Sequence, residues 1–219
     1  MTIASPTSTP RKRLRKEERR ELILAAAPRV FAERGYGGAT IAEIANDAGV
    51  VKSVVYDHFG SKQELYVELL RQHADALTSH VFDSDASGSS LDRFRARTDA
   101  FFEFVERDPF AWRMLFRDPP AGDPTIAALH SFIHARARDA IREQFAATRS
   151  LSFEFDVPRT MANEMAAQAV KSINDGLAAW WYEHRDVPRE VVTGIAVDLA
   201  WRGIEQFARG SARVDRGRT

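Results

Sequence analysis

The sequence from residue 39 to residue 62, ATIAEIANDAGVVKSVVYDHFGSK, places a small residue, a glycine and an aliphatic residue at the spacing of a helix-turn-helix. In this motif two short helices cross so closely that the position of Ala45 must be small. Gly49 supplies the positive φ that the turn needs, and Val55 packs the second helix onto the first. Three further apolar residues would complete this small core: Ile41, Ile44 and Val50.

Two helix-start signals flank the motif. Thr40 with Glu43, and Ser61 with Glu64, each match the capping box, in which side chains at both positions satisfy free amides of the first turn. Gly35 ends an earlier apolar stripe, as a helix C-terminal glycine does. The pattern therefore predicts helices over residues 17–35, 41–48, 52–58 and 61–82.

The rest of the chain also has helical spacing of apolar residues. It predicts helices over residues 91–106, 109–116, 125–149, 158–184 and 188–209. The segment SLSFEFDVP alternates briefly, but a single strand has no partner, so we expect a loop there. The fold class that follows is all-α: an N-terminal three-helix unit with a helix-turn-helix, fused to a larger helical body.

Composition narrows the functional class. Forty-four per cent hydrophobic and 28 per cent charged residues are typical of a globular protein, and the chain has no cysteine. The N-terminus lacks a signal-peptide pattern, so we expect a cytoplasmic protein. Residues 1–62 carry 11 Lys and Arg against 7 Asp and Glu, a net charge of +4, which leaves −4 for the remainder because the whole chain is neutral. The positive charge of this N-terminal segment favours contact with a polyanion such as DNA.

The segment with the capping boxes resembles the DNA-binding part of the TetR family of bacterial transcriptional regulators. The resemblance covers about residues 22–70 and includes a Thr helix start, an EIA core, AGV at the turn, Tyr-x-His-Phe and a Ser-Lys start to the next helix. It implies that the chain binds a double-stranded DNA operator; the alternative is a three-helix packing unit without DNA. The implied phosphate contacts are Thr40, Tyr56, His58 and Lys62, and the implied base-edge contacts are Lys52, Ser53 and Val54.

Two positions depart from the family pattern. Val51 stands where the family usually has Ser or Thr at the cap of the recognition helix, and Asp57 replaces a more usual aromatic or His. A carboxylate beside DNA is repelled by phosphates unless it accepts a hydrogen bond from cytosine N4. Asp57 is therefore included among the DNA-facing residues, and the operator sequence cannot be inferred from relatives.

Three parts of the chain are expected. Residues 1–16 are expected to form a disordered basic arm, residues 17–62 the DNA-binding domain, and residues 63–219 an effector-binding and dimerisation domain. The basic run at residues 11–20 is either the solvated start of a helix or a phosphate-contacting arm.

The larger body is expected to sense a small molecule. Its segment FFEFVERDPFAWRMLF is rich in aromatic residues, which indicates either a well-filled core or an apolar cavity between helices. A weaker likeness to actinobacterial relatives that sense long acyl chains or acyl thioesters implies an apolar or acyl-like effector. The candidate effector residues are Phe101, Phe102, Val105, Trp112, Leu115, Phe116, Phe132, Met165 and Asn174.

The last helix is expected to form a homodimer. Its apolar residues include small ones, so it can pack against a second copy or within the subunit; the candidates are Val192, Ile195, Leu199, Gly203 and Ile204. A single recognition helix reads few base pairs, whereas a two-fold pair reads a palindrome. We expect a repressor released by its effector, with a transcriptional activator as the alternative.

Other functional classes have little support. The sequence lacks a Gly-x-Ser-x-Gly elbow and a phosphate-binding loop, so we expect no enzyme and no cofactor. His130 and His134 have metal-ligand spacing on one helix, but no third ligand can be named, so we expect no metal. A basic arm that binds anionic lipid is a further alternative, but with Leu14 as its only apolar residue we expect no membrane binding.

Overall fold

The computed structural model describes residues 15–82, 87–116, 122–147 and 157–214, with side chains described as far as Gly203 in the last helix. Within these residues the protein consists of nine helices and no strands, which confirms the all-α prediction. The chain divides into two compact units, Met1–Leu65 and Tyr66–Thr219. None of the helices in the described ranges combines the length and the hydropathy needed to cross a bilayer.

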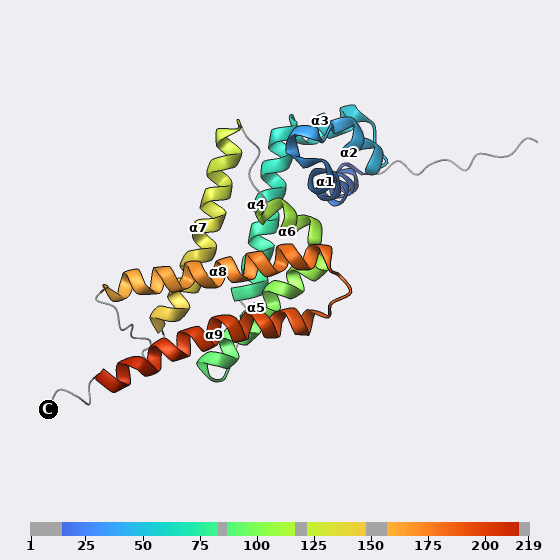
Figure 1. Ribbon diagram of the computed structural model, residues 1–219. Helices are drawn as coiled ribbons and strands as arrows, with labels where there is room; N and C mark the ends of the chain where they lie inside the picture. The colour runs from blue at the N-terminus through green and yellow to red at the C-terminus, as the bar shows by residue number, and fades with distance from the viewer. Residues whose placement is uncertain (1–14, 83–86, 117–121, 148–156, 215–219) are drawn as a thin grey trace, which may run out of the picture. The chain divides into compact units, whose positions relative to one another are not determined.

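The first unit contains α1 (Lys16–Gly38), α2 (Ile41–Asp47), α3 (Lys52–Phe59) and the start of α4 (Lys62–Phe82). Figure 1 shows α1, α2 and α3 grouped in the blue part of the ribbon. Gly35 interrupts α1 with φ of 70° and ψ of 163°, so the regular helix ends where the sequence predicted. The core is made of apolar side chains from the three helices: Ile23, Ala27, Phe31, Ile41, Ile44, Val55 and Phe59.

The turn between α2 and α3 has the geometry that the sequence predicts. Gly49 has φ of 66°, and a Cβ on it would meet no atom within 4 Å, so conformation rather than space requires glycine there. Ala45 is buried, and its carbonyl accepts a hydrogen bond of 2.9 Å from the Val50 amide. The helix-turn-helix is therefore held by the three residues whose spacing first suggested it.

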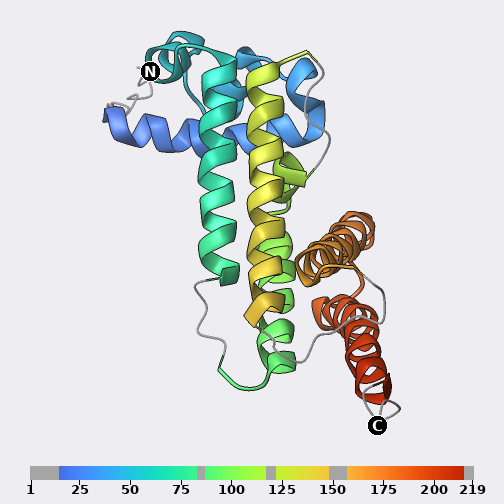
Figure 2. The ribbon, with the colours of Figure 1, turned by 90° about the vertical axis from the view of Figure 1, so that its left-hand side faces the viewer.

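The second unit contains most of α4 and the helices α5 (Ser90–Arg107), α6 (Pro109–Phe116), α7 (Pro124–Ala147), α8 (Arg159–Glu183) and α9 (Arg189–Val214). α8 packs against both α7 and α9, and α9 also packs along α5 (Figures 1 and 2). Their shared core contains Phe94, Phe145, Ala167, Val170, Val197 and Ala200. The last helix ends five residues later than predicted, and residues 150–156 of the expected loop lie outside the described ranges.

Candidate nucleic-acid interface and ligand cavity

The recognition helix α3 separates its buried and exposed residues cleanly. Val55 and Phe59 are buried in the core of the first unit. The side chains on the opposite face are exposed: Lys52, Ser53, Tyr56 and Asp57. Val54 and His58 are half-buried at the edges of that face, and the Lys52 ammonium lies 5.7 Å from the centre of the Tyr56 ring. A short helix with a polar outer face of this kind fits the major groove of DNA.

Thr40 caps α2 as predicted. Its hydroxyl accepts a hydrogen bond of 3.2 Å from the Glu43 amide, and Glu43 Oε2 in return accepts from the Thr40 amide at 2.9 Å. The Thr40 hydroxyl also donates to Glu43 Oε2 at 2.8 Å, and these contacts lower the pKa of Glu43. The first turn of α2 is thus held in place, with Thr40 exposed at its start.

Val51 occupies the N-cap position of α3 without a side-chain hydrogen bond to the first turn. Its backbone is extended, with φ of −87° and ψ of 151°, and its side chain is 65% exposed. Ser or Thr at such a position normally accepts from an amide of the first turn. The departure noted in the sequence therefore leaves the start of the recognition helix uncapped by a side chain.

Lys62 is tied into the first unit. Its ammonium donates to the carbonyl of Tyr36 at 2.7 Å and to the carbonyl of Ala39 at 3.0 Å, and it lies 4.5 Å from the centre of the Tyr36 ring. An ammonium has three N–H donors, and these two hydrogen bonds use two of them. The sequence suggested the phosphate role and missed the structural one.

His58 lies within a group of cations from the start of α1. Burial is the largest cause that lowers the pKa of His58, and the positive charges of Lys16, Arg19 and Arg20 lower it further. The Arg20 guanidinium also lies 5.3 Å from the centre of the Phe59 ring. The described end of the basic run therefore places positive charge beside the C-terminal end of α3. Of the residues proposed as a basic arm, 1–14 lie outside the described ranges.

The second unit contains a pocket with a mostly apolar lining, and the space of about 570 Å³ between its lining atoms includes open solvent. Three of the sequence-predicted effector residues line it: Phe101, Phe116 and Asn174. The end of α4 contributes Leu77 and Val81. The apolar lining with a few polar groups is typical of a site for a small organic molecule.

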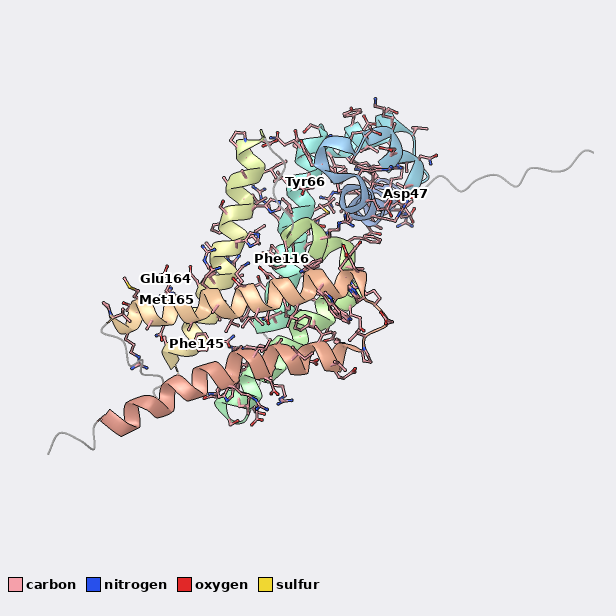
Figure 3. All side chains as sticks on the ribbon, viewed as in Figure 1. Asp47, Tyr66, Phe116, Phe145, Glu164 and Met165 are labelled. Carbon is pink, nitrogen blue, oxygen red and sulfur yellow. The ribbon has the colours of Figure 1, made fainter. Side chains whose placement is uncertain are left out.

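The other candidate effector residues lie elsewhere. Phe102, Val105, Trp112 and Leu115 are buried in the core, where Phe102 packs edge-on against Trp181. Phe132 and Met165 are 59% and 63% exposed and do not line the cavity. Figure 3 labels Met165 in the first half of α8, and Phe116 at the end of α6.

Three charged side chains of the cavity wall were missed from the sequence. Lys171 and Asp175, one turn apart on α8, form an ion pair, and the Lys171 ammonium lies 5.3 Å from the centre of the Phe116 ring. Burial raises the pKa of Asp175, against the smaller effect of Lys171. Arg97 on α5 is the third. The i,i+4 spacing of Lys171 and Asp175 is visible in the sequence, but their burial is not.

Several large apolar side chains of α8 and α9 are exposed. On α9, Ile195 and Leu199 are exposed as a dimer face requires, whereas Val192 is buried within the subunit. The side chain of Ile204 lies outside the described residues, and Gly203 is half-buried. Further exposed apolar side chains on the two helices, missed from the sequence, are Met161, Trp180 and Val191.

His130 and His134 lie one turn apart on α7 with ring centres 6.3 Å apart. Burial lowers the pKa of each to about 4, so both rings are neutral at pH 7. Within the described part of the chain no group of three His, Cys, Asp or Glu side chains is placed to hold a metal ion.

Comparisons with known proteins agree with the arrangement of these elements. Residues 23–69 match the family described as bacterial regulatory proteins, tetR family. The chain is 34% identical over 193 residues to the HTH-type transcriptional activator FasR of Mycolicibacterium smegmatis, covering 88% of this chain and 85% of that protein. It is 38% identical over 89 residues to the HTH-type transcriptional repressor KstR2 of Mycobacterium tuberculosis, covering 40% of this chain and 44% of that one. A TetR-like transcriptional regulator from Rhodococcus sp. RHA1 has a similar fold, with a TM-score of 0.73 at 21% identity, over 88% of this chain and 99% of that chain.

Proposed function

Because this chain belongs to the TetR family of bacterial transcriptional regulators, whose members bind DNA rather than catalyse reactions, we propose that it is a ligand-responsive regulator that binds a palindromic operator as a homodimer. The observation that carries the proposal is the face of α3. Four polar side chains stand exposed on a helix whose opposite side is fixed by Val55 and Phe59.

The proposed roles on DNA follow from position. Lys52 and Ser53 lie in the first turn of α3, where the recognition helix of this motif meets base edges, with Val54 and Asp57 beside them. Thr40, Tyr56, His58 and Lys62 contact phosphates. Lys16 and Arg19 add positive charge near His58, and such charge strengthens binding to any DNA sequence.

The proposed dimer interface is the outer surface of α8 and α9. Its exposed side chains Ile195, Leu199, Met165 and Trp180 leave a set of large apolar groups facing water on each subunit. A two-fold contact between such surfaces buries these side chains on both copies. It also brings two recognition helices together, so that the dimer can bind the two half-sites of a palindrome.

The proposed effector is a small, largely apolar molecule that occupies the cavity of the second unit. Its binding favours one arrangement of the dimer and so changes operator affinity. A 100-fold change in operator affinity needs about 2.7 kcal/mol of coupling between the effector site and the DNA-binding unit. The chain is proposed to act in the cytoplasm, where operators are found.

The proposed regulator either represses or activates transcription. Repression follows where the operator overlaps a promoter, as we expect by default. Activation is the second candidate, and it is favoured by the name of FasR, the relative that matches 88% of this chain.

The test is a selection from a randomised double-stranded DNA library with the purified protein at fixed salt. The expected product is a palindromic consensus with half-sites about one helical turn apart, which protects both half-sites in a footprint. Recovery of unrelated sequences, with equal affinity for the selected site and its scrambled version, would contradict the proposal. Transcription from a promoter with the selected site upstream or overlapping then gives the sign.

A further inference from the structure

His58 is a titratable side chain at the edge of the proposed DNA-binding face. It lies in the last turn of α3 and is half-buried, whereas Tyr56 and Asp57 beside it are exposed. The centre of its ring lies 6.1 Å from that of Phe59, a buried residue of the small core. The imidazole therefore rests beside the core and remains partly accessible to solvent.

A group of cations at the start of α1 lies next to this imidazole. Lys16, Arg19 and Arg20 are spaced by three and four residues, so they share one side of the helix. The Arg20 guanidinium lies 5.3 Å from the centre of the same Phe59 ring that His58 contacts. The buried Nε of Arg19 has no hydrogen-bond partner among the described residues. The first turns of α1 thus bring positive charge to the end of α3 where the imidazole lies.

The charged groups around His58 keep it neutral in the free protein. Burial is the largest cause that lowers its pKa from 6.5, and the three α1 cations lower it further, whereas Asp57 acts in the opposite direction. The other helix that packs against α3 is α2, which carries Glu43 and Asp47. Glu43 is held in the capping box of α2, and Asp47 forms an ion pair with Arg29. At pH 7 the imidazole is therefore uncharged before DNA arrives.

A DNA phosphate at this position reverses the balance in two ways. Its negative charge favours the imidazolium over the neutral imidazole, which raises the pKa of His58. It also offsets the charge of Lys16, Arg19 and Arg20, and so weakens the repulsion that disfavours a further cation. Histidine is the side chain for which such changes fall between about pH 5 and pH 8.

We propose that each subunit takes up one proton from solvent on His58 when it binds DNA, so that operator affinity rises as the pH falls. The inference rests on the proposed function in taking His58 as a phosphate contact, and it adds regulation by pH to that contact.

The sign follows from linkage between the proton and DNA. Between the pKa of free His58 and its raised pKa in the complex, the bound state holds a proton that the free state lacks, so affinity falls as the pH rises through this window. One proton for each subunit limits the change to about ten-fold per pH unit and subunit. Below the pKa of free His58 both states are protonated, and affinity no longer depends on this group.

The experiment measures binding of the purified full chain to the selected operator between pH 6 and pH 8 at constant ionic strength. Fluorescence anisotropy gives the affinity. Calorimetry in phosphate and in Tris, which differ in ionisation enthalpy, gives the number of protons taken up. The chain has six histidines, so NMR of histidine-labelled protein follows the His58 ring with and without DNA.

Three variants identify the titrating group. His58→Gln keeps a hydrogen-bond donor that does not titrate, and His58→Arg keeps a fixed positive charge. The matched control is His184→Gln, at an exposed histidine of the second unit. Urea unfolding of each variant verifies that it folds, and the NMR measurement needs only the wild type.

The wild-type affinity is expected to fall at least about three-fold per pH unit between pH 6 and pH 8, with proton uptake in the calorimeter. The pKa of His58 is expected to be higher in the complex than in the free protein. Both His58 variants should bind with little dependence on pH, and His184→Gln should behave as the wild type. Constant wild-type affinity over this range, an unchanged His58 pKa on DNA, or equal pH dependence in the His58 variants overturns the proposal.

A second variant tests the role of the α1 cations without DNA. Lys16→Gln removes one of the charges that repel the imidazolium, so the pKa of His58 in the free protein should rise. Lys52→Gln, at an exposed cation of α3 that is not among those charges, should leave it unchanged. Failure of the wild type to bind any DNA at any pH counts against the proposed function, whereas operator binding without proton uptake counts against this inference alone.

Discussion

The ammonium of Lys62, at the first residue of α4, donates a hydrogen bond of 2.7 Å to the carbonyl of Tyr36, 26 residues earlier near the end of α1. The same ammonium also donates to Ala39, the residue before the cap of α2. One side chain thus holds the ends of three helices of the DNA-binding unit.

Removal of this ammonium is expected to destabilise the first unit. Lys62→Met keeps the aliphatic stem but loses two hydrogen bonds from a charged donor, so we expect unfolding free energy to fall by about 2 kcal/mol. Urea unfolding measures this, with the exposed Lys52→Met as a control expected to change by less than about 0.5 kcal/mol. An unchanged midpoint for Lys62→Met would mean that the carbonyls are satisfied by water.

Replacement of Val51 by Ser is expected to stabilise the recognition helix. The extended backbone and 65% exposed side chain of Val51 suit a capping hydroxyl, which is worth about 1 kcal/mol. Thermal unfolding of Val51→Ser should show the gain. Val51→Ala, which removes the same apolar group without adding a hydroxyl, should not show it.

Two substitutions on α3 are expected to separate affinity from sequence preference. Tyr56→Phe removes the hydroxyl of a proposed phosphate contact, so it should weaken binding to the selected site and to its scrambled version by the same factor, about five-fold. Ser53→Ala should change the preferred base at one position of each half-site. Fluorescence anisotropy at fixed salt measures both; a change of preference in Tyr56→Phe and none in Ser53→Ala would reverse the assigned roles.

The α8–α9 surface is tested through Leu199, which is 60% exposed. A glutamate at this position would be buried without a partner in the dimer, so Leu199→Glu is expected to yield monomers and to weaken operator binding at least ten-fold, about 1.4 kcal/mol. Sedimentation velocity gives the oligomeric state. The neighbouring Asp198→Asn, which alters only an exposed ion pair with Arg202, is expected to remain dimeric.

Acid is expected to destabilise the second unit through His130, whose side chain is only 2% exposed. Burial lowers its pKa from 6.5 to about 4. Below pH 6.5 His130 therefore binds a proton in the unfolded chain but not in the native state. The free energy of unfolding falls progressively as the pH falls to about 4. At 1.36 kcal/mol per pKa unit the loss is roughly 3 kcal/mol.

Urea unfolding between pH 7 and pH 4 measures this loss. His130→Leu should reduce the pH dependence, and His184→Gln, at an exposed position, should keep it. An equal pH dependence in His130→Leu and the wild type would assign the loss to other groups.

Features that depend on neighbours in the sequence were predictable. The Thr40–Glu43 capping box, the positive φ of Gly49 and the breaks at Gly35 and Pro109 each follow from local geometry, and the structure has them. Helical spacing also separated the inner and outer faces of α3. Most helix ends lie within two residues of the predicted ones, since caps, glycine and proline act within one turn, whereas α9 ends five residues later than predicted.

Contacts between distant segments were not predictable in this way. The partners of Lys62 are backbone carbonyls, which leave no trace in the side-chain pattern. Phe132 and Val192 have helical spacing like their neighbours, but one is exposed and the other buried, because the side of a helix that faces its own subunit depends on where the other helices pass. The cavity lining came from α4, α5, α6, α7 and α8, and only part of it could be named in advance.

The recognition helix buries two of its eight residues, and both face inward. The α3 side chains that we propose to meet DNA therefore contribute little to the core of the unit, and the two that form the core do not face the proposed DNA surface. A new operator can be adopted by exchanging residues such as Ser53 or Asp57 one at a time, with each intermediate protein still folded. In this way the same fold can come to bind a different operator without passing through an unstable intermediate protein.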